Sequence, residues 1–231
     1  ERERARTLLG EVLKEDPANA EALLLRGNLL LAGNDAEGAV ADARTVLRTA
    51  PRSVPALRLL ADAQMRGSDA TLAMDTLAQL IEADPDSAFA REALAALHVR
   101  RGNLDKGLDL LNAALNRAPQ RAQSLLAKAE ILIAQRKWDE ANTTIQAILA
   151  LPDRAFDGHL LAGRRLQAMG RGDDAVRAFE QARALKPGAP EPLTGIAQSY
   201  LAADKTKEAI ATLRKATAAA PQDAFAHNLL G

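Results

Sequence analysis

Apolar residues recur along the chain at helical spacing, in pairs of blocks separated by short polar breaks. One block covers Leu23–Leu31 and the next covers Ala39–Leu47. Because residues three and four positions apart share one face of a helix, each block predicts a helix with one buried side. The break between these blocks, Gly33-Asn34-Asp35, consists of turn-forming residues. The pattern therefore predicts antiparallel helical hairpins.

Glycines in the breaks are expected to end the first helix of each hairpin. They include Gly33, Gly67, Gly102 and Gly170, and we expect them to adopt the left-handed backbone conformation. The stretch Gly170-Arg171-Gly172-Asp173 superficially suggests a phosphate-binding loop. Such loops follow a strand and carry more glycines at fixed offsets, so we interpret this stretch as an interhelical turn.

Prolines divide the chain into units of about 34 residues. They stand at Pro17, Pro51, Pro85, Pro119, Pro152, Pro187 and Pro221, with spacings of 34, 34, 34, 33, 35 and 34. Because proline lacks a backbone N–H and disfavours helix at the preceding residue, each one is expected to follow the end of a helix. The short spacing before Pro152 predicts that the second helix of that unit ends early.

Small residues recur at two positions of the unit. With proline placed at position 32, positions 8 and 20 are occupied by Gly27/Ala39, Ala61/Ala73, Ala95/Gly107, Ala129/Ala141, Gly163/Ala175 and Ala197/Ala209. All twelve are glycine or alanine. Two helices can cross closely only with such residues at the crossing, where a leucine would overpack the contact by roughly 1–3 kcal/mol.

These positions resemble the tetratricopeptide repeat family, whose unit has small residues at 8 and 20, large ones at 4, 7, 11 and 24, and proline at 32. The best match runs from Phe156 to Pro187. The resemblance implies an all-α, right-handed α-solenoid of stacked antiparallel helical hairpins, a TPR superhelix in the style of bacterial arrays. Ala43 at position 24 and Gln64 at position 11 depart from the pattern, so their units are expected to pack less tightly.

The phase of the repeat predicts a single array over residues 1–231. We expect the second helix of a partial repeat at 1–19, the start of another partial repeat at 224–231, and six full repeats at 20–53, 54–87, 88–121, 122–155, 156–189 and 190–223. The chain is expected to be a piece of a longer array, with any targeting segment outside it. Its apolar ends predict possible self-association through Leu8, Val12, Leu13, Leu229 and Leu230.

Composition narrows the function classes. Formal net charge is zero, with 30 basic and 30 acidic residues, which argues against nucleic acid as a partner. The chain has no cysteine, which excludes thiolate metal sites and cysteine nucleophiles. No apolar run approaches the roughly 18–20 residues needed to cross a bilayer, so we expect no direct membrane insertion by this stretch. The compartment stays open between bacterial periplasm and cytoplasm.

No group of residues has the spacing of a catalytic site, so we expect no enzyme activity, cofactor or metal. His98, His159 and His227 fall in three repeats at positions where the family places packing residues, and burial there would disfavour their charged form. We expect Trp138 to wedge between the helices of its own repeat. Phe179 and Tyr200 are expected to be core residues.

The family resemblance implies a partner-binding groove on the concave face, lined by the first helices at positions 2, 5, 9, 12 and 13. The candidate residues are Asn28, Arg58, Asp62, Arg66, Phe89, Glu92, Arg100, Glu130, Arg164 and Gln198. The two arginines on either side of Asp62 are also spaced to pair with it along their helix. Leu24 stands where chaperone-tail binders of the family carry a lysine, which argues against a carboxylate clamp.

We therefore expect a non-enzymatic scaffold that binds a protein or peptide in the groove. The composition resembles bacterial arrays, some of which serve envelope assembly or exopolysaccharide export. The alternative is a regulatory or targeting arm of a larger enzyme whose catalytic domain lies outside this sequence.

Overall fold

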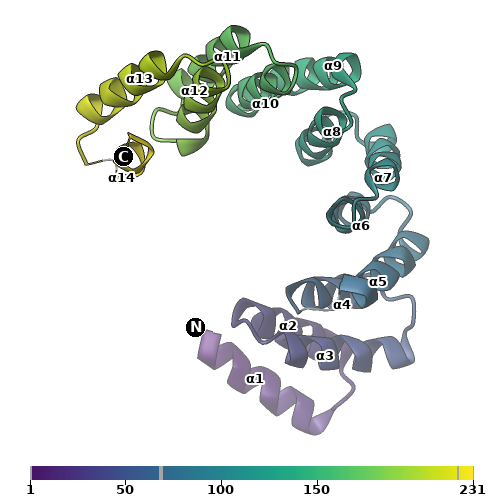
Figure 1. The fold of residues 1–231 in the computed structure, drawn as a ribbon. Coiled ribbons are helices and arrows are strands. Elements are labelled where there is room, and N and C mark those ends of the chain that lie inside the picture. The colour runs from purple at the N-terminus through teal and green to yellow at the C-terminus, as the bar shows by residue number, and fades with distance from the viewer. Residues whose placement is uncertain (1, 68–69, 223, 231) are drawn as a thin grey trace. The chain divides into compact units, whose positions relative to one another are not determined.

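The computed structural model describes residues 2–67, 70–222 and 224–230, and in these ranges it contains fourteen helices and no strand (Figure 1). The helices are joined by short turns. The predicted all-α repeat fold is confirmed.

Helices of two kinds alternate along the chain, as the hairpin pattern predicts. The helices here termed first helices are α2 (Ala20–Ala32), α4 (Val54–Arg66), α6 (Ala88–Arg100), α8 (Ala122–Ala134), α10 (Ala155–Ala168), α12 (Pro190–Ala202) and α14 (Ala224–Leu230). The second helices are α1 (Arg2–Glu15), α3 (Ala36–Thr49), α5 (Ala70–Ala83), α7 (Leu104–Arg117), α9 (Trp138–Leu149), α11 (Gly172–Leu185) and α13 (Thr206–Ala219).

The prolines end the second helices where the sequence predicts. Each one follows the last residue of a second helix by two positions, except Pro152, which follows Leu149 by three. Helix α9 has 12 residues, whereas α7 and α11 each have 14. The early end of this helix before Pro152 is therefore confirmed.

Short polar side chains cap several helix starts. The Asn19 carboxamide oxygen accepts from the Ala22 N–H at 3.0 Å, and the Asp35 carboxylate accepts from the Gly38 N–H at 2.8 Å. Such contacts satisfy backbone donors that have no partner within the helix.

The left-handed residues in the turns only partly match the prediction. Gly102 and Gly170 have φ of +79° and +76°, as expected. At the first turn, however, Asn34 has φ +65° while Gly33 has φ −93°, so the prediction for Gly33 is wrong. Asparagine tolerates this conformation because its short polar side chain can hydrogen-bond locally. Gly67 has φ −71°, so the prediction for Gly67 is also wrong, and residues 68–69 lie outside the described ranges.

The chain forms two compact units, Glu1–Arg117 and Ala118–Gly231. In the first unit, α2, α4 and α6 follow one another on one side and α3, α5 and α7 on the other (Figure 1). Its core includes Leu57, Leu77, Leu80 and Leu97. Each helix buries the apolar stripe that its sequence spacing predicts.

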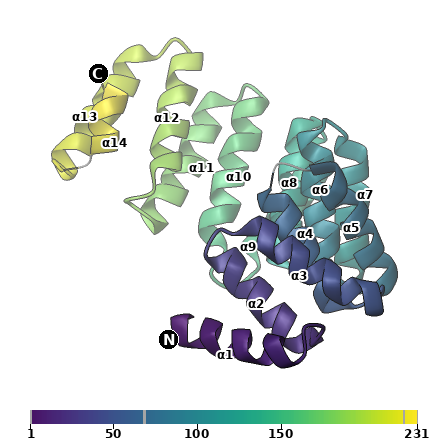
Figure 2. The same cartoon turned by 90° about the horizontal axis from the view of Figure 1, so that it is seen from below.

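In the second unit, α10, α11 and α12 pack against one another side by side (Figure 2). The first helices also contact their neighbours directly, with α8 against α10, α10 against α12 and α12 against α14. Phe179 is 1% exposed and packs with Ala175, Val176 and Ile196, which confirms it as a core residue.

All twelve small residues at positions 8 and 20 are buried. A Cβ at Gly163 would lie 2.6 Å from the ring of Phe179 on the paired second helix. A Cβ at Gly27 would instead lie 2.4 Å from the side chain of Leu59, which belongs to the following first helix. The small residues therefore permit close approach both within a hairpin and between hairpins.

The apolar positions near the ends of the array are only partly exposed. Leu8 is 54% and Val12 43% exposed, but Leu13 is buried against Leu23 and Val46. The prediction that Leu13 belongs to an unpaired face is wrong, because α2 and α3 cover it. Leu229 packs against the core formed by residues of α12, α13 and α14, and the side chain of Leu230 lies outside the described residues.

Candidate functional site

All ten predicted groove residues lie on first helices, and their side chains are exposed or half-buried. We call the surface that the first helices present within each unit the first-helix face. The unit Glu1–Arg117 contributes Asn28, Arg58, Asp62, Arg66, Phe89, Glu92 and Arg100, and the unit Ala118–Gly231 contributes Glu130, Arg164 and Gln198.

In the first unit, Arg58 and Phe89 meet across two successive first helices. The guanidinium carbon of Arg58 lies 4.5 Å from the centre of the Phe89 ring. A cation over an aromatic face is attracted by the ring quadrupole, and the contact holds the half-buried ring in place. The pair presents a flat surface that is apolar at one edge and cationic at the other.

Asp62 lies on the same helix as Arg58 and Arg66, one turn from each. The expected ion pairs do not form: no arginine nitrogen in the described ranges lies within 4.0 Å of the Asp62 carboxylate, and Arg66 donates instead to the Leu31 carbonyl at 3.0 Å. Burial raises the pKa of Asp62, although the positive charges of Arg58 and Arg66 oppose this shift. The face thus carries a half-buried carboxylate with unused acceptor capacity.

Part of the hydrogen-bonding capacity of the Asn28 side chain is already used within its own helix. Its side-chain N–H donates to the Leu24 carbonyl of the same helix at 2.8 Å. It borders a strongly apolar hollow of about 450 Å³ between α1 and α2, lined by Leu8, Leu9 and Leu25 among others.

In the second unit, Arg164 and Gln198 border one hollow of about 310 Å³. Helices α10, α12 and α14 supply its walls, and its other polar side chains are Gln167, Glu191 and Thr194. Two residues chosen from repeat position alone therefore share a concave site.

The floor of this hollow depends on glycine. The Phe179 ring lies between Gly163 and Gly195, and a Cβ on Gly195 would approach the ring to 2.5 Å. Any larger residue at Gly195 would clash with the ring. Because the ring is closely packed on its other sides, relieving the clash would require the surrounding core to shift. The glycine keeps the hollow open above the apolar ring.

Glu130 joins this site through Arg164, whose Nη1 lies 3.2 Å from Glu130 Oε1. The pair links α8 to α10 and is largely exposed, so its contribution to stability is small. Arg164 can therefore exchange Glu130 for an acidic group of a partner at little loss.

Sequence reasoning missed a buried ion pair between α2 and α3. Arg26 donates to both carboxylate oxygens of Asp42, at 2.9 and 2.6 Å, and Asp42 is 3% exposed. The hydrogen bond from Arg26 to Asp42 raises the pKa of the guanidinium. The sequence does contain an indication of this ion pair, because the charged Arg26 stands at position 7, where the family pattern has a large packing residue.

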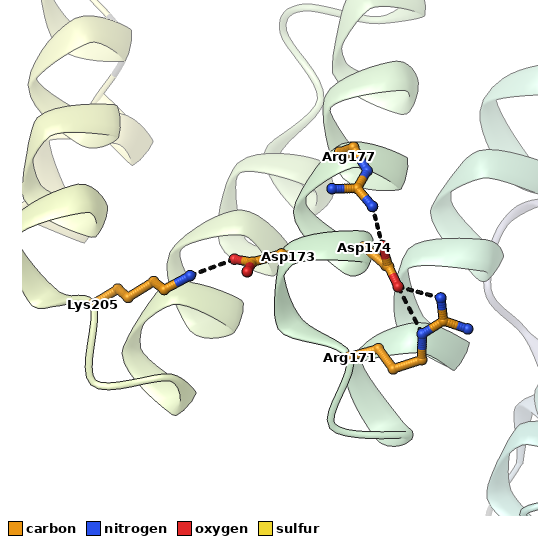
Figure 3. Close-up of polar contacts among 5 residues, drawn as sticks. All are labelled: Arg171, Asp173, Asp174, Arg177 and Lys205. Atoms are coloured by element: carbon orange, nitrogen blue, oxygen red, sulfur yellow. Dashed lines mark hydrogen bonds and ion pairs between the residues drawn. The ribbon is translucent and has the colours of Figure 1, made fainter.

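Charged side chains also link successive hairpins at the turns. Lys205 Nζ lies 2.6 Å from Asp173 Oδ1, and Asp174 lies between Arg171 and Arg177 (Figure 3). The hydrogen bond from Lys205 lowers the pKa of Asp173. The stretch that superficially suggests a phosphate loop is confirmed as an interhelical turn, and its one acidic residue, Asp173, is paired with Lys205.

The histidines are separate from one another and differ in exposure. Burial, together with Lys106 and Arg101, lowers the pKa of half-buried His98, as predicted. His227 is exposed, so the prediction that it packs in the core is wrong; its ring nitrogen Nε2 lies 3.1 Å from the Pro221 carbonyl oxygen. Trp138 is half-buried at the first position of α9.

Two features are absent from the described part of the chain. No cluster of three or more histidine, aspartate or glutamate side chains there could hold a metal ion. No helix there combines the length and hydropathy needed to cross a bilayer.

Family models match most of the chain. Models described as "Tetratricopeptide repeat" match residues 166–231, and residues 1–54 and 25–88. A model described as "Anaphase-promoting complex, cyclosome, subunit 3" matches residues 63–148.

Among curated proteins, Anaphase-promoting complex subunit 7 of Arabidopsis thaliana is 33% identical over an alignment of 112 residues, and the match covers 45% of this chain and 20% of that protein. The chain thus spans about one fifth of the length of this relative.

Solved structures share the fold at low identity. A tetratricopeptide repeat protein from Parabacteroides merdae has a TM-score of 0.77 at 19% identity, covering 85% of this chain and 78% of its own. PilW, a type IV pilus biogenesis factor, has a TM-score of 0.73 at 17% identity, covering 92% and 98%. Proteins of this class bind protein partners, and their fold is typically non-catalytic. The helical hairpins, the 34-residue period and the family matches agree, and the chain is a tetratricopeptide repeat protein.

Proposed function

We propose that this chain is a non-enzymatic scaffold that binds a polypeptide segment on its first-helix face. The observation that carries the proposal is the hollow bordered by Arg164 and Gln198, with Phe179 as its floor. Binding sites for side chains are typically concave, mainly apolar at the base and polar at a few points of the rim.

The chemistry of the rim indicates the kind of segment that fits. Arg164 and Glu191 give the rim both signs of charge, and the carboxamides of Gln167 and Gln198 can both donate and accept hydrogen bonds. A segment with an apolar side chain for the hollow and flanking residues of both signs would match it.

The first unit offers a compatible surface of its own. Arg58 over Phe89 provides an apolar and cationic platform, and the Asp62 carboxylate can accept a hydrogen bond from a partner's basic side chain or backbone N–H. The proposal excludes nucleic acid, because the chain has no net positive charge to attract phosphate.

We place this activity in a multiprotein assembly. Similarity to a subunit of the anaphase-promoting complex over 45% of the chain supports this placement. A bacterial setting in envelope assembly or exopolysaccharide export rests on the Ala-, Leu- and Arg-rich composition. Cell fractionation of the native organism would test it, and a purely cytoplasmic location would count against export.

Two alternative roles, self-association and regulation of an enzyme, have their own tests. Self-association through Leu8 and Val12 predicts a sedimentation coefficient that rises with concentration and falls back when both are replaced by serine. A role as the arm of an enzyme predicts that the flanking sequence encodes a catalytic domain.

Peptide selection from a random display library on the purified chain tests the proposal. We expect enriched peptides to lose about tenfold or more in affinity with Arg164→Glu, which reverses the charge at the rim. Arg214→Glu is the matched control, since Arg214 is exposed on α13 and does not line the hollow. Equal loss with both variants, or no loss with Arg164→Glu, would contradict binding at this face.

A further inference from the structure

Arg164 brings a positive charge to the hollow of the second unit. Of the residues that line this hollow in the described ranges, Arg164 is the one cation and Glu191 is the one anion. The other polar side chains of the rim, from Gln167, Thr194 and Gln198, are neutral. An acidic group of a partner at this rim therefore depends on Arg164 for its countercharge.

The guanidinium of Arg164 is paired on the opposite side of its helix. Helix α10 lies between α8 and α12, and the hollow is on the α12 side (Figure 1). Arg164 Nη1 lies 3.2 Å from Oε1 of Glu130, which is on α8 and does not line the hollow. Glu130 thus holds the charged end of Arg164 toward α8, away from the place where a partner in the hollow would meet it.

This ion pair is particular to two successive repeats. Both residues stand at repeat position 9, where the six full repeats carry Asn28, Asp62, Ala96, Glu130, Arg164 and Gln198. Glu130 and Arg164 are the only successive residues of this row with opposite charges. Helices α2 and α4, and likewise α10 and α12, pack on each other without such a pair. The ion pair is therefore not a requirement of the repeat fold.

We propose that Glu130 regulates the hollow by competing with an acidic residue of the polypeptide partner for Arg164. This inference rests on the proposed function of the first-helix face. The partner that fits carries an apolar side chain for the hollow and, beside it, an aspartate or glutamate on the α10 side. Binding moves the guanidinium from Glu130 to the partner's carboxylate, so the affinity gained is the difference between the two ion pairs.

The exposure of the ion pair determines the size of the effect. The side chains of Arg164 and Glu130 are 44% and 61% exposed, and ion pairs as exposed as this contribute little free energy. The pair lowers the fraction of molecules whose guanidinium is free to accept a partner, so removing Glu130 should strengthen binding by about threefold. Glu130 therefore tunes the affinity and leaves binding possible.

Peptides from a random dodecapeptide display library are the probe that tests the proposal. We expect the peptides enriched on the wild-type chain to contain aspartate or glutamate more often than the unselected library does. Glu130→Gln removes the charge while keeping the size of the side chain, and it should lower the Kd of such a peptide by about threefold. The same peptide with its acidic residue changed to the corresponding amide should show no gain.

The matched control is Glu180→Gln, which makes the same change at an exposed glutamate of α11 in the same unit. Glu180 does not line the hollow, so this variant should leave the Kd unchanged. Equal gains in the two variants would indicate general charge repulsion and would overturn the proposal.

A double-mutant cycle with Arg164→Gln establishes whether Glu130 acts through the arginine. In the Arg164→Gln background, Glu130→Gln should give no gain in affinity, and a gain that persists there would overturn the competition. The two proposals can fail separately. Loss of binding in Arg164→Glu together with an unchanged Kd in Glu130→Gln would support the first-helix face and refute the role of Glu130, whereas a library that yields no binding peptide would overturn both.

Discussion

At the residue scale, single substitutions within an otherwise regular repeat decide what each hairpin can do. Asp42 is buried at repeat position 23 and is paired with Arg26 at position 7. In the next repeat, position 23 is Thr76 and position 7 is Leu60. An isolated buried carboxylate is strongly unfavourable, so Asp42 depends on its arginine.

We expect Arg26→Leu to destabilise the protein by about 3 kcal/mol. This value is near the lower end of the range for removing one partner of a buried ion pair, because the Arg26 guanidinium is partly exposed. The double variant Arg26→Leu, Asp42→Thr copies the following repeat and should recover most of that loss. Urea denaturation of the three proteins measures both effects. Equal stability of the single and double variants would show that the pair is not coupled.

The half-buried Asp62 leads to a prediction of how the stability of the protein depends on pH. Its folded-state pKa is raised above its ordinary value of 3.8 by burial, so its contribution to stability is fully present at acidic pH and is lost as pH rises through the raised pKa. Replacing it with asparagine should therefore stabilise the protein at pH 7 by about 0.5 kcal/mol, a small figure because water screens the half-exposed carboxylate. The difference should vanish near pH 3, and thermal unfolding at both pH values checks it.

At the element scale, the helices and their ends could be predicted from the sequence because they depend on local chemistry. Proline ends each second helix wherever it occurs, and small residues at the crossings are needed in every hairpin. The placement of the ten groove residues on first helices followed from the same register. The hollows could not be predicted, because their volumes depend on how neighbouring helices pack; Gly195, for example, matters only because Phe179 of the preceding repeat lies beneath it.

The helix crossings give a prediction for elements. Ala175 and Ala209 are both buried at position 20, and leucine at either should overpack its crossing by roughly 1–3 kcal/mol. Because each repeat contacts mainly its neighbours, faster amide hydrogen exchange in Ala175→Leu should be confined to α10, α11 and α12. Faster exchange spread over α2 to α5 would contradict this nearest-neighbour account.

At the scale of the whole molecule, the chain combines balanced charge with local concave sites in each of its two units. The polar residues around these sites carry both signs, which suits recognition of a particular polypeptide more than general attraction to a charged polymer. The fold supplies the framework, while Gly195 leaves room for the Phe179 ring beneath the hollow of the second unit. Function therefore follows from departures from the repeat.

Site-specific photo-crosslinking in the native cell tests the central claim most directly. A benzoylphenylalanine at Gln198, on the first-helix face, is compared with the same group at Ala211, exposed on α13 of the same unit. We predict a discrete protein adduct from position 198 that is lost when Arg164→Glu is added, and no such adduct from position 211. An adduct from position 211 but none from position 198 would contradict binding at the first-helix face.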